Sequence, residues 1–95
     1  MLREALRLRV EKFGPGDRRT AKAQRALGVC LAALGQRREA EQLLLDSHHT
    51  LASATNWYHR TLWRQTTRDL VTLYDRWGRP EQAAAFREEM RDDGR

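Results

Sequence analysis

The sequence is poor in the residues that build β-strands, disulfides and membrane spans. Isoleucine is absent and no run alternates valine or threonine with polar residues, so nothing indicates a strand. A single cysteine, Cys30, excludes an internal disulfide, and its apolar neighbours predict a small buried side chain. The longest apolar run, residues 29–34, is far too short to span a bilayer. Because the start lacks a secretory pattern, we expect a cytoplasmic protein.

The chain has 95 residues and a formal net charge of +5. A chain of this length forms one small domain with a modest core. The positive charge raises the question of nucleic acid or an acidic membrane surface as a partner. Acids nevertheless alternate with arginines along most of the chain, as on a solvated helix face. The exception is a stretch where only Asp17 accompanies four cations, Arg18, Arg19, Lys22 and Arg25.

Two segments repeat one pattern at an offset of 43 residues. Small residues fixed beside a turn are typical of stacked helix pairs, which bury their apolar faces only against neighbouring pairs. The pattern therefore predicts an all-α protein built of antiparallel pairs. The matched residues are Leu27 and Leu70, Leu31 and Tyr74, Leu34 and Trp77, Gly35 and Gly78, Ala40 and Ala83, and Leu43 and Phe86.

Apolar residues at helical spacing predict five helices. Residues 14–16, Gly-Pro-Gly, stop the first helix, because proline removes a donor and disfavours helical geometry in the residue before it. Glycines end the second and fourth helices, and Pro80 suits the first turn of the last. The expected helices cover residues 2–13, a second from a cap at Asp17 or Thr20 to Leu34, a third from about Arg37 to a frayed end at 53–56, a fourth to Trp77, and a last from Pro80 to about Asp92.

Each expected helix has an inner face. Ala40 and Ala83 are predicted to be small because the second helix of each pair crosses close to the first there. The residues expected to face inward are Leu2, Ala5, Leu6 and Phe13; Ala23, Leu27, Cys30, Leu31 and Leu34; Ala40, Leu43, Leu44, Ser47 and Leu51; Leu62, Thr66, Leu70, Leu73, Tyr74 and Trp77; and Ala83, Phe86 and Met90.

The pattern resembles the tetratricopeptide repeat (TPR), in the long-period variety of kinesin light chains and many bacterial arrays. Residues 14–20 are similar to the loop Gly-Pro-Asp-His-Pro-x-Thr of that variety, without its His-Pro step. Residues 25–45 and 70–90 match the cores of two units. Residues 73–84 also resemble the closing repeat of some bacterial serine/threonine kinases and signalling proteins.

This resemblance implies a short right-handed solenoid of about two and a half repeats. Residues 1–13 would be the second helix of a pair whose first helix is missing, and residues 17–55 and 57–92 would be complete repeats. The link at residues 53–62 departs from the family loop, which leaves the angle between the two repeats open.

The resemblance also implies a ligand groove, because the first helix of each pair lines the concave side of such arrays. Most of its polar members here are cationic, which favours an acidic segment or a C-terminal carboxylate as ligand. The like charges of Lys22, Arg25, Arg68 and Arg76 are expected to repel one another; alternatively, these side chains are merely solvated. The predicted groove residues are Lys22, Arg25, Val29, Ala32, Gln65, Arg68, Thr72 and Arg76.

We therefore expect a non-catalytic module that binds a protein or peptide, the C-terminal piece of a larger bacterial array or signalling protein. The alternative is a structural segment that self-associates or docks through the open face of its first helix. Nucleic-acid binding is a weaker alternative. Trp57, Tyr58 and Trp63 lie among arginines and could stack on bases, but aromatics at such a link are expected to fill the junction between repeats.

Catalytic, metal and cofactor sites are not predicted. His48 and His49 point about 100° apart on a helix and cannot share one metal ion unaided. Cys30 lacks the accessible, electropositive setting of a catalytic thiol. Neither Glu88 nor Glu89 lies where a pocket is expected, so no acid-base pair is apparent.

Overall fold

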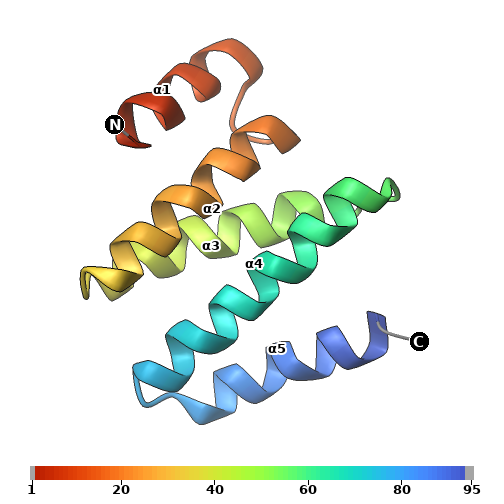
Figure 1. Ribbon diagram of the computed structural model, residues 1–95. Coiled ribbons are helices and arrows are strands. Elements are labelled where there is room, and N and C mark those ends of the chain that lie inside the picture. The colour runs from red at the N-terminus through yellow and green to blue at the C-terminus, as the bar shows by residue number, and fades with distance from the viewer. Residues whose placement is uncertain (1, 94–95) are drawn as a thin grey trace.

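The computed structural model describes residues 2–93, with side chains described as far as Arg91. This part of the chain is all-helical and contains no strand, which confirms that the protein is all-α. Met1, within the expected first segment, lies outside the described residues. The helices, shown in Figure 1, are α1 (Leu2–Phe13), α2 (Arg18–Ala33), α3 (Arg37–Leu51), α4 (Trp57–Arg76) and α5 (Pro80–Asp93).

The helices form a thin slab in which each one packs against the next in sequence. The Cα atoms extend over 35 × 32 × 14 Å. The contact between α2 and α3 is the most extensive, and α2 also touches α4. In Figure 1, α2 and α4 follow the same diagonal, with α1 at one end of the slab and α5 at the other. The first helices of the two pairs are thus neighbours.

Both helix pairs close with the same turn. Gly35 and Gly78 have φ of 82° and 76°, the left-handed conformation that glycine adopts without steric cost. The N–H of Gln36 donates to the carbonyl of Leu31 at 2.9 Å, and the N–H of Arg79 donates to that of Tyr74 at 2.8 Å. Each is the six-to-one bond of a Schellman motif. The two glycine turns predicted from the repeat are confirmed.

Side chains at the helix starts decide where α2 and α4 begin. Asp17 is the N-cap of α2, since its carboxylate accepts the N–H of Arg19 at 2.8 Å. Thr20, the alternative cap, is instead buried and donates its hydroxyl to the carbonyl of Gly14 at 2.7 Å. Asn56 caps α4 by accepting the N–H of Tyr58 at 2.7 Å.

One apolar core runs from α2 to α5. Ala40 and Ala83 are fully buried within it, as their small size predicts. The hydroxyl of buried Tyr74 donates to Glu41 at 2.7 Å and ties α4 to α3. The buried members of this core are Leu27, Leu31, Ala40, Leu44, Leu70, Leu73, Tyr74 and Ala83.

A second, smaller cluster joins the start of α2 to the end of α3 and the first turns of α4. It consists of Ala21, Leu51, Leu62 and Trp63. The buried hydroxyl of Ser47 donates to the carbonyl of Ala21 at 2.8 Å, which satisfies a polar group at the helix crossing. The expected end of the third helix at residues 53–56 is too late, because α3 ends at Leu51. Within the link that follows, Ala54 is buried.

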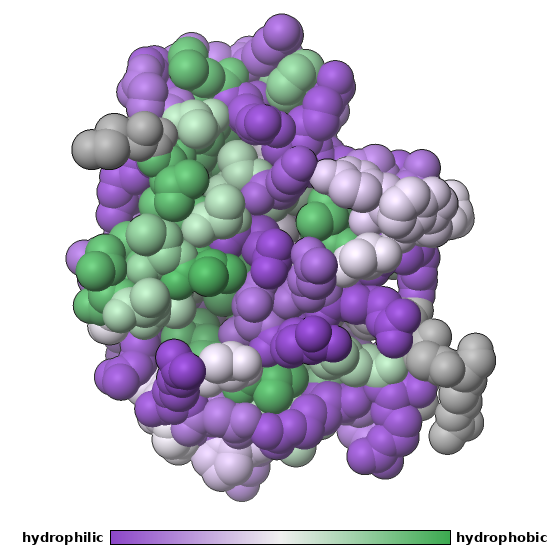
Figure 2. Space-filling model, viewed as in Figure 1, coloured by the Kyte–Doolittle hydropathy of each residue, from purple (hydrophilic) through white to green (hydrophobic). Residues whose placement is uncertain are grey.

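Several residues predicted to be buried are exposed. Cys30 is exposed, because the buried stripe of α2 runs through Leu27, Gly28 and Leu31 and a helix turns about 100° per residue. Leu34 lies beyond the last turn of α2 and is 68% exposed. On α1, Leu2 and Ala5 are also exposed, because this helix contacts α2 alone among the described elements. Figure 2 shows the resulting apolar band along one side of the molecule, over α1 and α2.

The aromatic residues at the link between the pairs divide into two groups. Trp63 is buried in the smaller cluster and fills the junction, as predicted. Trp57 is 78% exposed and Tyr58 is 40% exposed, so the same expectation is wrong for them. They occupy the first turn of α4, whereas Trp63 lies almost two turns further along the helix.

Candidate functional site

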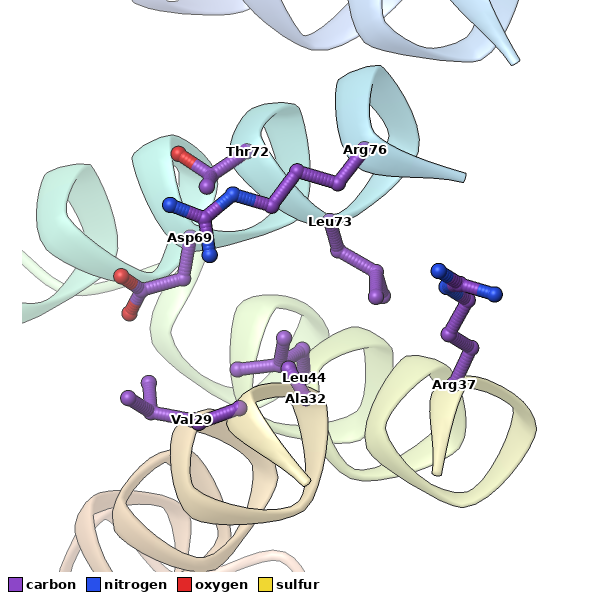
Figure 3. A pocket seen from close by; sticks show the side chains of 9 residues that line it. Val29, Ala32, Arg37, Leu44, Asp69, Thr72, Leu73 and Arg76 are labelled. Carbon is purple, nitrogen blue, oxygen red and sulfur yellow. The ribbon is translucent and has the colours of Figure 1, made fainter. Parts of the chain in front are cut away.

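A pocket of about 190 Å³ lies between α2 and α4, where the end of α2 meets the start of α3. Its apolar lining comes from Val29 and Ala32 of α2, Leu44 of α3 and Leu73 of α4. In Figure 3, Leu73 approaches from α4, and Val29, Ala32 and Leu44 lie opposite it. The lining residues are Val29, Ala32, Ala33, Arg37, Leu44, Asp69, Thr72, Leu73 and Arg76.

Charged side chains border this apolar lining. In Figure 3, Arg76 extends along α4 so that its guanidinium lies near Thr72 and Asp69, while Arg37 stands on the far side of Leu73. Asp69 is already paired, because its carboxylate accepts the Nε–H of Arg25 at 2.6 Å. Among residues 2–91, no carboxylate forms an ion pair with Arg37 or Arg76. The pocket therefore carries two uncompensated positive charges beside an apolar surface.

The pocket contains only part of the groove predicted from the sequence. Val29, Ala32, Thr72 and Arg76 line it together. Gln65 and Arg68 are exposed on α4 outside its lining. Lys22 lies elsewhere, with its ammonium 5.6 Å from the centre of the Tyr58 ring.

The sequence predicted that four groove cations repel one another, but this prediction does not hold for Arg25. The guanidinium of this residue is held by Asp69 across the α2–α4 contact, and both side chains are partly buried. A close ion pair of this kind removes the like-charge cost that the sequence indicated.

Two charged pocket residues, Arg37 and Asp69, were not predicted as groove residues from the sequence. Asp69 lies one position after the repeat equivalent of Arg25, so opposite charges at neighbouring register positions were the available signal. Arg37 follows the Gly35 turn and is the first residue of α3, which brings it back beside the end of α2. The tight turn was the signal for that return.

The His48 side chain packs among aromatic rings. Its ring lies 5.4 Å from that of Trp63 and 5.2 Å from that of Phe86. Burial lowers the pKa of His48 below its ordinary value, while the Glu89 carboxylate at 3.6 Å opposes this effect. His49 is exposed on the neighbouring position. In the part of the chain that the structure describes, no group of three or more His, Cys, Asp or Glu residues could hold a metal ion.

Comparisons with known proteins give no match: no protein-family model, curated protein or solved structure is significantly similar to the chain. Within the described residues, no helix combines the length and the apolar character needed to cross a membrane.

Proposed function

We propose that this protein is a non-catalytic TPR-like module that binds a protein or peptide segment in the pocket between α2 and α4. The observation that carries the proposal is the apolar lining flanked by Arg37 and Arg76, neither of which is paired with a described carboxylate. The 43-residue repeat, the matching glycine turns and the contact of α2 with α4 support the assignment to stacked helix pairs. The resemblance of residues 73–84 to the closing repeat of some bacterial kinases supports a bacterial array or signalling protein as its context, and we propose a cytoplasmic location.

The ligand is a segment that presents one apolar side chain and at least one carboxylate. A volume of about 190 Å³ suits a single aliphatic side chain between Val29 and Leu73. It lies below the several hundred Å³ of a typical small-molecule site. Arginine forms strong, charge-assisted hydrogen bonds with carboxylates, so Arg37 and Arg76 select an acidic residue or a C-terminal carboxylate beside the anchor. An interface built around one anchor favours modest affinity.

The test uses a fluorescent acidic peptide that ends in leucine, compared with the same peptide carrying neutral amides. Arg76→Glu weakens binding of the acidic peptide at least about tenfold, since hydrogen bonds to charged groups contribute about 1.5–3 kcal/mol. Ala33→Leu fills the pocket and weakens binding without changing charge. Arg38→Glu is the matched control, because Arg38 is exposed beside Arg37 but does not line the pocket. Equal binding by Arg76→Glu and Arg38→Glu would refute the proposal.

A second candidate function, self-association, rests on the apolar band of α1 and α2 in Figure 2. Leu8 of α1 is exposed, and so is Leu34, which directly follows the end of α2. Apolar patches of this kind mark protein interfaces. Analytical ultracentrifugation of the chain and of Leu34→Ser tests this candidate: a dimer that Leu34→Ser dissociates supports it, and a monomer at high micromolar concentration excludes it.

A further inference from the structure

The first turns of α2 and α4 form an exposed aromatic and cationic surface, which we call the aromatic end. Figure 1 shows the two helix starts on the same side of the molecule. The surface lies apart from the α2–α4 pocket, and the two share no lining residue. Its members are Arg18, Lys22, Trp57, Tyr58 and His59.

Three rings stand in a row on this surface. The ring centres of Trp57 and Tyr58 are 6.1 Å apart at an interplanar angle of 85°, and those of Tyr58 and His59 are 5.3 Å apart at 67°. Since neighbouring rings are steeply inclined, they do not stack on one another. Trp57 is not part of either apolar cluster of the described residues, so folding gives no reason for a tryptophan at this position.

Cations adjoin the rings. The Lys22 ammonium lies 5.6 Å from the centre of the Tyr58 ring, and Arg18 borders an open hollow with His59. Among the described residues that line this hollow, Asp17 is the only acid. Its charge is compensated by Arg19, whose side chain and backbone N–H hold the pKa of Asp17 at about 2. The aromatic end is therefore positively charged.

We propose that the aromatic end binds single-stranded nucleic acid, with bases stacked on Trp57 and Tyr58 and phosphates paired with Lys22 and Arg18. Exposed rings beside cations are the means by which proteins bind single strands with little sequence preference. A membrane surface fits less well, because it requires a continuous apolar helix face. The exposed positions that follow on α4 are instead polar, namely Thr61, Gln65 and Arg68.

The experiment measures the fluorescence anisotropy of a labelled oligothymidylate of about 12 nucleotides. The wild-type protein binds it, and Trp57→Ala weakens binding about tenfold through the loss of one stacked base. Trp57→Phe keeps most of the affinity. Affinity falls as salt is added, so the slope of log affinity against log salt is negative. Lys22→Gln makes this slope shallower by about 0.7 between about 50 and 200 mM salt, the value for one phosphate contact on a single strand. Arg38→Gln is the control, because it removes the same single positive charge at the start of α3, away from the aromatic end. This variant keeps the wild-type slope.

Three outcomes would overturn this proposal. One is the absence of oligonucleotide binding by the wild type at about 50 mM salt. Another is equal binding by wild type and Trp57→Ala, with the fold of both checked by circular dichroism. The third is binding to phosphatidylserine vesicles that depends on Trp57 while oligonucleotides are ignored. Arg76→Glu distinguishes this proposal from the proposed peptide binding. It weakens binding of the acidic peptide in the pocket, while the oligonucleotide still binds at the aromatic end.

Discussion

The two helix pairs, α2 with α3 and α4 with α5, share a skeleton but differ in how far they are covered. Position 28 is glycine in the first pair, where an added Cβ would lie 2.9 Å from Cγ of Leu44. The repeat equivalents of Gly28 and Leu44 are Val71 and Arg87. Leu44 is fully buried, whereas Arg87 is exposed and pairs with Asp75. Because α3 packs between α2 and α4, whereas the described part of α5 packs mainly on α4 and meets α3 through the side chains of Phe86 and Glu89 at His48, the same position is core in one pair and surface in the other.

The second pair also replaces leucine with aromatic residues. The ring of Tyr74 is nearly parallel to those of Trp77 and Phe86, at centre distances of 6.4 and 5.8 Å. Their equivalents in the first pair are leucines. Large rings bury more surface per residue. The second pair, α4 with α5, therefore buries apolar surface through its own large side chains. The first pair, α2 with α3, buries part of its apolar surface against neighbouring helices.

The largest expected effect is a difference in stability loss between substitutions at the equivalent positions 44 and 87. Leu44→Ala removes a fully buried side chain and lowers the free energy of unfolding by about 2–5 kcal/mol. Arg87→Ala removes only an exposed ion pair and costs at most about 1 kcal/mol. Urea unfolding of both variants measures the difference. Similar losses at the two positions would show that α5 is covered as thoroughly as α3.

The next effect concerns the small residues at the helix crossings. Ala40→Leu and Ala83→Leu each overpack a fully buried site and cost about 1–3 kcal/mol. The loss is larger at Ala40, because α3 is held between two helices and α5 can move outward. Ala84→Leu, on an exposed face of α5, is the control. An unchanged unfolding midpoint for Ala40→Leu would contradict the observed packing.

The turns provide a case in which the two pairs are expected to behave alike. A Cβ at Gly35 or Gly78 meets no atom within 4 Å, so alanine there costs only the left-handed backbone conformation, about 1–2 kcal/mol. Thermal unfolding of Gly35→Ala and Gly78→Ala should give equal losses within error. Clearly unequal losses of stability would mean that one of the two glycines has a role beyond its left-handed backbone conformation.

The smallest effect is the pH dependence due to His48. Its pKa in the folded protein is lowered from 6.5, mainly by burial between α3, α4 and α5, against the pull of Glu89. The unfolded chain therefore binds the proton more readily, and stability falls as the pH drops below about 6.5. Unfolding at about pH 7.5 and 5.5 tests this. His48→Phe reduces the difference between the two pH values, while His49→Phe changes it less, because His49 adds only a smaller charge repulsion to the effect of burial on His48; the reverse result would contradict the assignment.

The sequence predicted those features that repeat or that depend on local geometry. The glycine turns, the buried alanines and the five helices follow from one register and from helical spacing. The exposure of Cys30 and Leu34 did not follow, because it depends on which helix lies opposite. Periodicity places a residue on a face of its helix but does not indicate whether another helix covers that face.

The candidate pocket was predictable in part for a similar reason. Val29 and Arg76 belong to the faces that the TPR resemblance assigns to a groove. The pairing of Arg25 with Asp69 depends on the distance between α2 and α4, which no local pattern contains. Trp57 and Trp63 have the same chemistry and lie in one helix, so only the three-dimensional packing separates the exposed ring from the buried one.

The hydrogen bond from Tyr74 to Glu41 sets a limit at alkaline pH. Burial, followed by this bond to a carboxylate, raises the pKa of Tyr74 well above its ordinary value of 10.0, so the folded protein keeps the phenol neutral. The unfolded chain has no such restriction and releases the proton near pH 10. Stability present at lower pH is therefore lost as the pH rises above that value. Ultraviolet titration should therefore show phenolate absorbance from Tyr74 only on alkaline unfolding.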